Sequence, residues 1–172
     1  MSLHVDVIIN SPAWESLPFD AAAVAEDITK LAYQKAVRPA ILQNRDTELS
    51  VVLSDNEEVQ ILNRDYRGKD KPTNVLSFAA LDDEESLTLI PQGESLPVGD
   101  IIISYQVLKE ESAHMGVTFQ DHYTHILIHG TLHVLGYDHE NEDDATLMES
   151  LEIQILAGLG IKNPYTHDKF MA

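Results

Sequence analysis

The sequence contains no cysteine, few cationic side chains and no long apolar stretch, and each absence narrows the range of functions. Among 172 residues there are 11 Lys and Arg against 29 Asp and Glu, which gives a net charge of −18. A generic polyanion-binding protein would carry a basic face and a high pI, so this composition argues against that class. It argues equally against a basic helix that lies on a membrane surface.

The missing cysteines exclude disulfides, thiolate metal sites and cysteine nucleophiles together. Their absence is consistent with a reducing compartment. The segment from Met1 to Asn10 alternates like a strand and lacks the basic start and apolar core of a signal peptide. No run approaches the roughly 18 apolar residues that a membrane span needs. We therefore expect a cytoplasmic protein without a membrane partner, folded as a single domain over residues 1–172.

The few cations are unevenly placed along the chain. Of the 11 Lys and Arg residues, 8 lie in the first 71 positions, and Arg64, Arg67, Lys69 and Lys71 fall close together. Beyond residue 71 the chain carries 3 cations and 17 acidic residues. At this point a solvated helix end explains the cationic cluster as well as a binding site for negative charge does.

Hydrophobic patterning predicts strands at residues 3–9, 48–54, 73–78 and 100–104. Helices are expected over residues 20–38, 55–68, 105–114, 118–135 and 141–158. The last helix should bury an apolar stripe made of Leu147, Met148, Leu151, Ile155 and Leu156. Residues 82–97 are expected to form a long acidic loop or hairpin. This mixture predicts an α+β fold with a small mixed sheet of about four strands covered by helices.

Five of the eight histidines lie between His122 and His139. His129 and His133 are four residues apart, which on an α-helix separates them by about 40° around the axis and about 6 Å along it. Gly136 can adopt the left-handed conformation that ends a helix, after which the chain can return His139 to the same point. Three neutral imidazoles with an open fourth position are typical of a catalytic zinc centre with one ion.

Other interpretations of these histidines stay open at this point. They could be satisfied core or surface residues, or they could form a structural zinc site completed by a carboxylate such as Asp138. Zinc suits three imidazoles best, although nickel, copper or cobalt would bind by the same chemistry. His125 either orients a ligand histidine or fills space, and His122 is expected to be exposed.

The spacing H-x-x-x-H-x-x-G-x-x-H is that of the metzincin proteases, whose motif is H-E-x-x-H-x-x-G-x-x-H. In those proteases the glutamate after the first histidine is the general base beside the metal. Here that position is Gly130, which cannot accept a proton. The pattern therefore predicts a zincin-like metal helix that lacks the base of standard peptide hydrolysis.

Three segments resemble the YbeY family. The sequence HGTLHVLGYDH from His129 to His139 resembles the family's HGxLHLxGYDH. The segment LNRDYRGKDKPTNVLSF at residues 62–78 is similar to LNxxYRxxxxPTDVLSF, and residues 99–104 are a weaker match to LGDIxIS. Asn74 stands where the family usually has Asp, which puts any ion pair of that Asp in doubt, and Ala79 replaces a common proline.

The resemblance implies a zinc-dependent bacterial endoribonuclease that matures ribosomal RNA, at the 3′ end of the small-subunit RNA, and serves ribosome quality control. It implies that His129, His133 and His139 hold the zinc. It marks Arg67 as functional, so Arg67 and His129 are the residues expected to carry the catalysis.

A phosphate clamp at Arg67 agrees with the chemistry of the side chain, because a guanidinium binds phosphate oxygens bidentately. Lys69 and Lys71 are close in sequence and would add positive charge. The alternative for Arg67 is a surface ion pair with Asp65 or Asp70.

Two further functions compete with RNA cleavage. A metallopeptidase would use the same zinc with a base other than residue 130. A non-catalytic ribosome-associated protein would use a structural zinc, and its acidic surface would dock a basic ribosomal protein. Ribosomal RNA and the ribosome or a ribosomal protein are the expected partners, whereas DNA is not expected.

Overall fold

The computed structural model describes residues 2–166 and is built on a four-stranded sheet of order β1-β2-β4-β3. The strands are Leu3–Ile9 (β1), Thr47–Ser54 (β2), Val75–Ala79 (β3) and Leu96–Ser104 (β4). β1, β2 and β4 are parallel to one another, and β3 runs antiparallel along the outer side of β4. The expected α+β fold with a small mixed sheet is confirmed.

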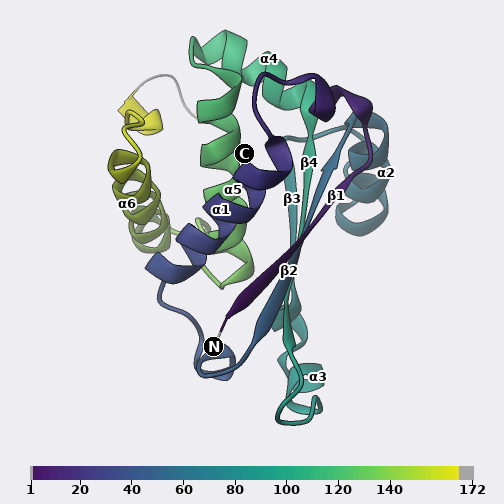
Figure 1. Cartoon of the computed structure of the whole chain (residues 1–172), viewed down its shortest axis with the longest axis vertical. Helices are drawn as coiled ribbons and strands as arrows, with labels where there is room; N and C mark the ends of the chain where they lie inside the picture. The colour runs from purple at the N-terminus through teal and green to yellow at the C-terminus, as the bar shows by residue number, and fades with distance from the viewer. Residues whose placement is uncertain (1, 167–172) are drawn as a thin grey trace.

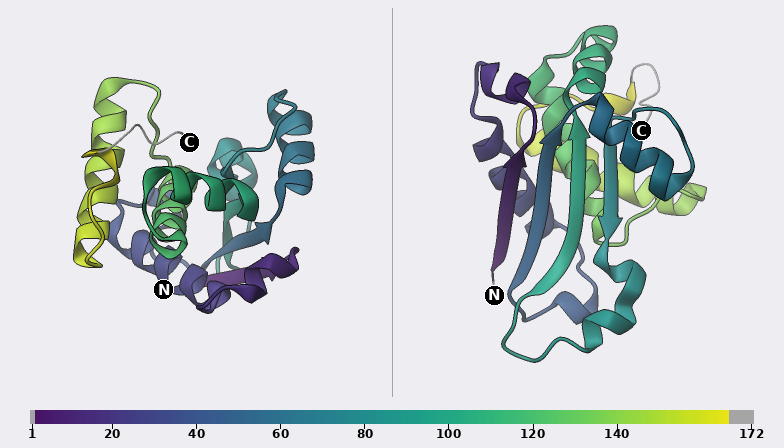
Figure 2. Two further views of the ribbon diagram at one scale, coloured as in Figure 1. Left: turned by 90° about the horizontal axis from the view of Figure 1, so that it is seen from above. Right: turned by 90° about the vertical axis from the view of Figure 1, so that its right-hand side faces the viewer.

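Helices cover both faces of the sheet, as Figures 1 and 2 show. The helices are Ala21–Lys35 (α1), Asn56–Arg67 (α2), Glu84–Thr88 (α3), Tyr105–Met115 (α4), Phe119–Val134 (α5) and Glu142–Gly158 (α6). Short 3-10 turns lie at Pro12–Ser16 (η1), Ala40–Leu42 (η2), Ala80–Asp83 (η3) and Pro164–Thr166 (η4). α1 and α5 pack on one face, α6 lies outside α5, and α2 covers part of the opposite face.

Side-chain alternation along β2 explains this layering. Leu49, Val51 and Leu53 are fully buried beneath α1 and α5, whereas Glu48 on the opposite face is exposed. Successive strand residues point to opposite faces, so one strand supplies both a core face and a polar face. A second, smaller apolar cluster under α2 contains Val59, Leu76 and Ile102.

α5 is the most deeply buried helix among the described residues, because the sheet, α1, α4 and α6 all contact it. Its N-cap is Thr118, whose hydroxyl accepts a hydrogen bond from the backbone N–H of Asp121 at 3.1 Å, as the capping pattern predicts. A helix buried on all sides has no solvated face for polar groups. The buried histidines of α5, which are His122, His125 and His129, therefore need partners from neighbouring elements.

α5 lies close to the sheet at Gly130. A Cβ atom built at this position would lie 3.0 Å from Cγ2 of Ile101 on β4 and 3.4 Å from Oγ of Ser77 on β3. A larger side chain there would force Ile101 or the helix itself to shift by a few tenths of an ångström. The glycine therefore fixes the distance between α5 and the edge of the sheet that carries β3.

We expect Gly130→Ala to lower the free energy of unfolding by about 1–3 kcal/mol, because overpacking at Ile101 outweighs the gain in helix propensity. Urea denaturation of the two proteins measures this difference. The matched control is Gly158→Ala in α6, where an added Cβ meets no heavy atom within 4 Å and stability should hold or rise slightly. Equal stability of Gly130→Ala and the unmodified chain would contradict the close approach.

Several boundaries differ from those expected. α1 ends at Lys35 rather than near residue 38, and β4 begins at Leu96 rather than at residue 100. The acidic segment contains the short helix α3, which begins because the Asp83 side chain accepts a hydrogen bond from the N–H of Ser86. The prediction that Leu147 is buried is wrong, because this residue is 63% exposed. The buried face of α6 instead contains Met148, Glu152, Ile155 and Leu156.

Among the described residues, no helix combines the length and the apolar character that crossing a membrane requires.

Candidate metal centre and phosphate cleft

The end of α5 brings three histidines together. Nitrogen atoms of His129, His133 and His139 all lie within 4.8 Å of one another. The ring centroids of His129 and His133 are 4.7 Å apart, and the His139 ring lies 5.7 Å from His129 and 5.0 Å from His133. The cluster runs from buried at His129 to exposed at His139, so a group held there would be open to solvent on one side.

The turn after α5 returns His139 to the helix. Gly136 adopts a positive φ of 102°, which an L side chain rarely takes, and its N–H donates to the carbonyl of His133 at 3.0 Å. The turn is tied to the end of α1, because the N–H of Val37 donates to Oη of Tyr137 at 3.0 Å. Asp138 accepts a hydrogen bond from the N–H of His139 at 2.7 Å, so it shapes the backbone beside the cluster.

A buried carboxylate on α6 faces the first histidine of the cluster. Nδ1 of His129 lies 3.0 Å from Oε2 of Glu152, whose residue is 0% exposed. Oε1 of the same carboxylate lies 2.6 Å from Nε2 of His125 and 2.5 Å from Oη of Tyr165, which belongs to η4. His125 therefore contacts the same carboxylate as His129. This contact favours the interpretation that His125 helps to orient a ligand histidine over the interpretation that it fills space.

Charge states in this region follow from burial and from hydrogen bonds. Burial alone would raise the pKa of Glu152, but the hydrogen bonds from His125 and His129 outweigh it and hold that pKa at about 2. Burial lowers the pKa of His125 despite its carboxylate partner. Burial and the neighbouring imidazoles lower the pKa of His133 to about 4. Glu152 is thus ionised, and His125 and His133 are neutral at pH 7. A neutral imidazole is the form that binds metal ions.

His122 was expected to be exposed, and this prediction is wrong. Its side chain is buried, and Nε2 lies 2.8 Å from Oε1 of Glu111 on α4. The same carboxylate accepts hydrogen bonds from the side-chain amide of Asn74 at 3.2 and 3.4 Å. The side-chain amide of Asn74 thus has a carboxylate partner.

A cleft of about 610 Å³ joins the histidine cluster to the cationic segment. Its lining includes the three clustered histidines together with Arg67, Lys69 and Lys71. The end of α2 places Arg67 beside β3, where Nη2 donates to the carbonyl of Ser77 at 2.8 Å and the guanidinium lies 5.6 Å from the Phe78 ring. The structure therefore brings the predicted phosphate clamp and the predicted metal ligands into one cleft.

The aspartates proposed as alternative partners of Arg67 are engaged elsewhere. Asp65 pairs with the guanidinium of Arg64 at 2.9 Å, and Asp70 accepts a hydrogen bond from Gln60 at 3.0 Å. A guanidinium carries five N–H donors, and the contact with Ser77 uses the donor capacity of one nitrogen. Donors of Arg67 thus remain for a ligand in the cleft.

Gly130, at the position of the protease general base, is not among the residues that line the cleft. A Cβ there would meet Ile101 and Ser77 of the sheet, so a glutamate would have to displace these side chains. The carboxylates that do line the cleft are Glu111, Asp138 and Glu140.

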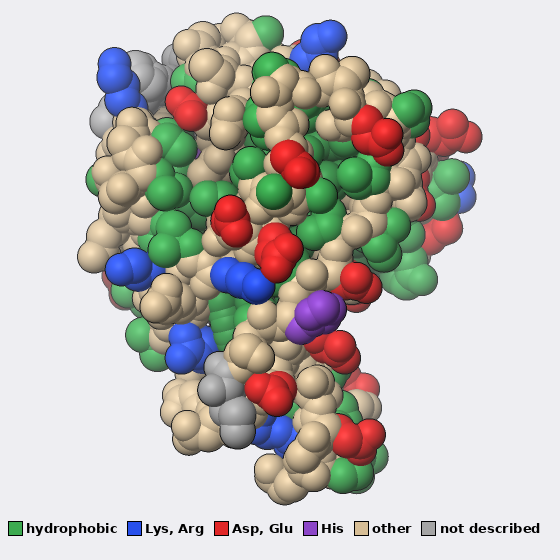
Figure 3. Space-filling model, in the orientation of Figure 1, with side chains coloured by type: hydrophobic (Ala, Val, Ile, Leu, Met, Phe, Trp, Pro, Cys, Tyr) green, Lys and Arg blue, Asp and Glu red, His purple; other side chains and the backbone are tan. Residues whose placement is uncertain are grey.

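On the face shown in Figure 3, the acidic side chains are spread out rather than gathered into one patch. The face in Figure 3 shows Asp and Glu side chains distributed among a few Lys and Arg residues. Counterion release from RNA needs many cations on one surface, so broad nonspecific binding is disfavoured. The cationic wall of the cleft is the local exception.

The fold and the site together define an α+β protein with a candidate three-histidine metal centre in a cleft that Arg67, Lys69 and Lys71 also line. The family described as Endoribonuclease YbeY matches residues 15–160. This chain belongs to that family, which confirms the resemblance of the motifs.

Curated relatives support the assignment over most of the chain. A protein named Endoribonuclease YbeY from Paramagnetospirillum magneticum is 43% identical over 165 residues, covering 96% of this chain and 97% of its own. The protein of the same name from Magnetococcus marinus is 53% identical over 121 residues, covering 69% of this chain and 82% of its own. The solution structure of TM1509 from Thermotoga maritima shares the fold, with a TM-score of 0.51 at 20% identity over 91% of each chain.

The sequence interpretation missed two parts of the site. Glu152 has the spacing of an ordinary polar residue on an amphipathic helix, and nothing local marks it as buried. Glu111 likewise resembles its exposed neighbour Glu110. A weak signal existed for both, because histidines on a fully buried helix require polar partners from other elements.

Proposed function

We propose that this chain is a metal-dependent endoribonuclease that processes ribosomal RNA, at the 3′ end of the small-subunit RNA. The observation that carries the proposal is the cleft that is lined both by the three-histidine cluster and by Arg67, Lys69 and Lys71. An RNA phosphodiester needs this combination of a metal ligand set and cations for phosphate oxygens. The names of the curated relatives agree with it.

His129, His133 and His139 are the proposed ligands of one zinc ion per chain. The donor set fits, since three nitrogen donors lie within 4.8 Å of one another and burial favours neutral imidazole at His133. Three imidazoles with one side open to solvent match a catalytic rather than a structural zinc site. Nickel, copper or cobalt would use the same ligands.

When bound, the metal would supply Lewis-acid polarisation and a more acidic water at neutral pH. Arg67 would bind two oxygens of the scissile phosphate and stabilise the charge that develops on them, because its planar donors match phosphate geometry. Lys69 and Lys71 would attract the neighbouring phosphates of the strand. His129 would serve the reaction by holding its ligand position against Glu152.

A metallopeptidase function is less well supported, because residue 130 is packed against the sheet and offers no base. A ribosome-binding protein with a structural zinc would need a fourth protein ligand. Asp138 was the candidate for this fourth ligand, but its Oδ1 already accepts a hydrogen bond from the backbone N–H of His139. RNA cleavage explains why Arg67 lines the same cleft as the three histidines.

We also propose that the ribosome or a ribosomal protein delivers the substrate, in the cytoplasm. A net charge of −18 disfavours tight binding to arbitrary RNA, so a docking partner would compensate for weak intrinsic affinity. A basic ribosomal protein is complementary to the acidic surface.

The substrate class is tested by incubating the purified chain with a ribosomal RNA precursor, with a duplex DNA of equal length and with an unstructured polypeptide. We expect cleavage of the RNA alone, abolished by a chelator and restored by zinc. Hydrolysis of the polypeptide would favour the peptidase, and metal binding without cleavage of any substrate would favour the ribosome-associated factor.

A further inference from the structure

Glu152 lies at the centre of a buried polar network that the proposed reaction does not itself require. It sits on α6 among core residues, and its side chain is 0% exposed. A buried carboxylate is strongly unfavourable unless hydrogen bonds compensate for the lost hydration. A hydrophobic residue at this point of the α6 stripe would pack without that penalty, so the carboxylate calls for a functional explanation.

The two carboxylate oxygens contact different partners. Oε1 lies 2.6 Å from Nε2 of His125 and 2.5 Å from Oη of Tyr165, and the rings of these two residues meet edge to face at 5.5 Å. Oε2 lies 3.0 Å from Nδ1 of His129. One oxygen is thus anchored by two side chains, while the other faces the cluster histidine.

The Oε2 contact determines which nitrogen of His129 carries the proton. An ionised carboxylate only accepts hydrogen bonds, so Nδ1 of His129 must be the protonated nitrogen. A neutral ring protonated at Nδ1 has its lone pair at Nε2, where a metal ion binds. The opposite tautomer would present an N–H to the metal and could not act as a ligand.

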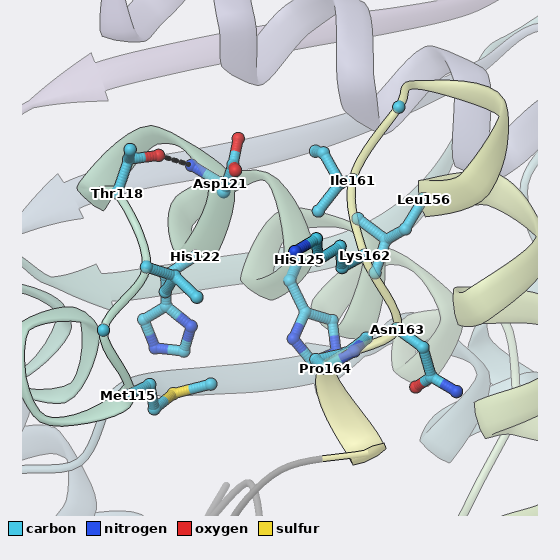
Figure 4. A pocket seen from close by; sticks show the side chains of 13 residues that line it. Met115, Thr118, Asp121, His122, His125, Leu156, Ile161, Lys162, Asn163 and Pro164 are labelled. Atoms are coloured by element: carbon cyan, nitrogen blue, oxygen red, sulfur yellow. Dashed lines mark hydrogen bonds between the residues drawn. The ribbon is translucent and has the colours of Figure 1, made fainter.

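His125 lies between this network and a second cavity of about 480 Å³. The cavity is bounded by the turn between α4 and α5 and by the segment after α6, and His122 and His125 both project into it from α5 (Figure 4). Lys162 lines the same cavity but is exposed. It therefore provides a control that disturbs the cavity without touching Glu152.

We propose that Glu152 is a positioning residue that fixes the tautomer and orientation of His129 for metal binding, and that His125 and Tyr165 hold Glu152 in place. This inference rests on the proposed metal centre. It extends that centre to α6 and to the turn η4, which contribute no metal ligand.

The test is a zinc titration of the metal-free full chain in competition with a chromophoric chelator. We expect Glu152→Gln to bind zinc roughly 10- to 100-fold more weakly, as is typical when a ligand histidine loses its outer-shell partner. Tyr165→Phe should cause a smaller loss, because it removes one of the two groups that hold Oε1. Lys162→Gln should bind like the unmodified chain.

A second readout separates positioning from mere packing. In the metal-free protein, the ring nitrogen shifts in NMR spectra should show His129 protonated at Nδ1, and this preference should be lost in Glu152→Gln. If Glu152→Gln does not fold, Glu152→Asp replaces it, since it keeps the charge but withdraws the oxygens. Unchanged zinc affinity in whichever of these two variants is folded would overturn the inference.

Failure of this inference is distinguishable from failure of the proposed function. If the unmodified chain binds no zinc, the metal centre itself is wrong. If it binds zinc and the folded Glu152 variant binds equally well, the metal centre stands and only the positioning role is wrong.

Discussion

Replacing His133 with alanine is expected to remove the metal from the protein and with it the cleavage of RNA. His133 lies between the other two proposed ligands in sequence, and its ring centroid is within 5.0 Å of both of theirs. Two imidazoles bind a divalent ion much more weakly than three, so the loss of activity should exceed the roughly 10- to 100-fold effect of losing an outer-shell partner. Elemental analysis and a single-turnover cleavage assay measure the two effects.

The matched control is His114→Ala, which removes an exposed histidine at the end of α4. Its metal content and activity should equal those of the unmodified chain. Because His133 is only partly buried, the fold should survive the substitution, which circular dichroism will check. Full RNA cleavage by a folded His133→Ala protein would refute the assignment of the metal ligands.

Arg67→Ala is expected to lower the rate of RNA cleavage by about 100- to 1000-fold, the range seen when one preorganised donor to a developing anion is removed. The metal content should not change, because Arg67 contacts Ser77 and Phe78 rather than the histidines. Single-turnover rates at saturating RNA isolate the catalytic effect from binding. Arg67→Lys should recover part of the rate, since it restores the charge but not the bidentate geometry.

Arg64→Ala provides the control for charge alone. Arg64 is on the same helix and pairs with the exposed Asp65, so its loss should change the cleavage rate little. If Arg64→Ala and Arg67→Ala reduce the rate equally, the cations act only through the general field of the surface, and the specific clamp at Arg67 is wrong.

The local features of the site could be predicted from the sequence because they depend on helical spacing and on a glycine. His129 and His133 share one face of α5, and the positive φ of Gly136 returns His139 to them. The cap at Thr118 and the end of α2 at Gly68 also follow from short-range rules. The four strands are likewise set by local patterning, although β3 begins two residues later and β4 four residues earlier than expected.

Features that depend on distant elements could not be predicted. The burial of His122 requires Glu111 on α4, and the buried Glu152 requires the particular rotation of α6 against α5. Leu147 was assigned to the core for the same reason, because the periodicity of α6 permits more than one buried stripe. The strand order, which places β4 between β2 and β3, also depends on pairings between distant segments.

The cationic wall of the cleft reconciles the net negative charge of the chain with an RNA substrate. A net charge of −18 argues against broad RNA binding, yet Arg67, Lys69 and Lys71 reverse the local charge along one wall of the cleft. The histidine cluster adds a candidate site for a divalent cation in the same cleft. The acidic residues elsewhere on the chain therefore do not argue against an RNA substrate. They argue that a docking partner is needed to bring the RNA to the cleft.

The most direct test is to titrate zinc into the metal-free chain while measuring bound metal and cleavage of a ribosomal RNA precursor in the same samples. The cleavage rate should rise in proportion to bound zinc and reach its plateau at one ion per chain, and His133→Ala should show neither response. Cleavage that is already complete in the metal-free protein, or that stays absent at full zinc occupancy, would contradict a metal-dependent ribonuclease centre at the three histidines.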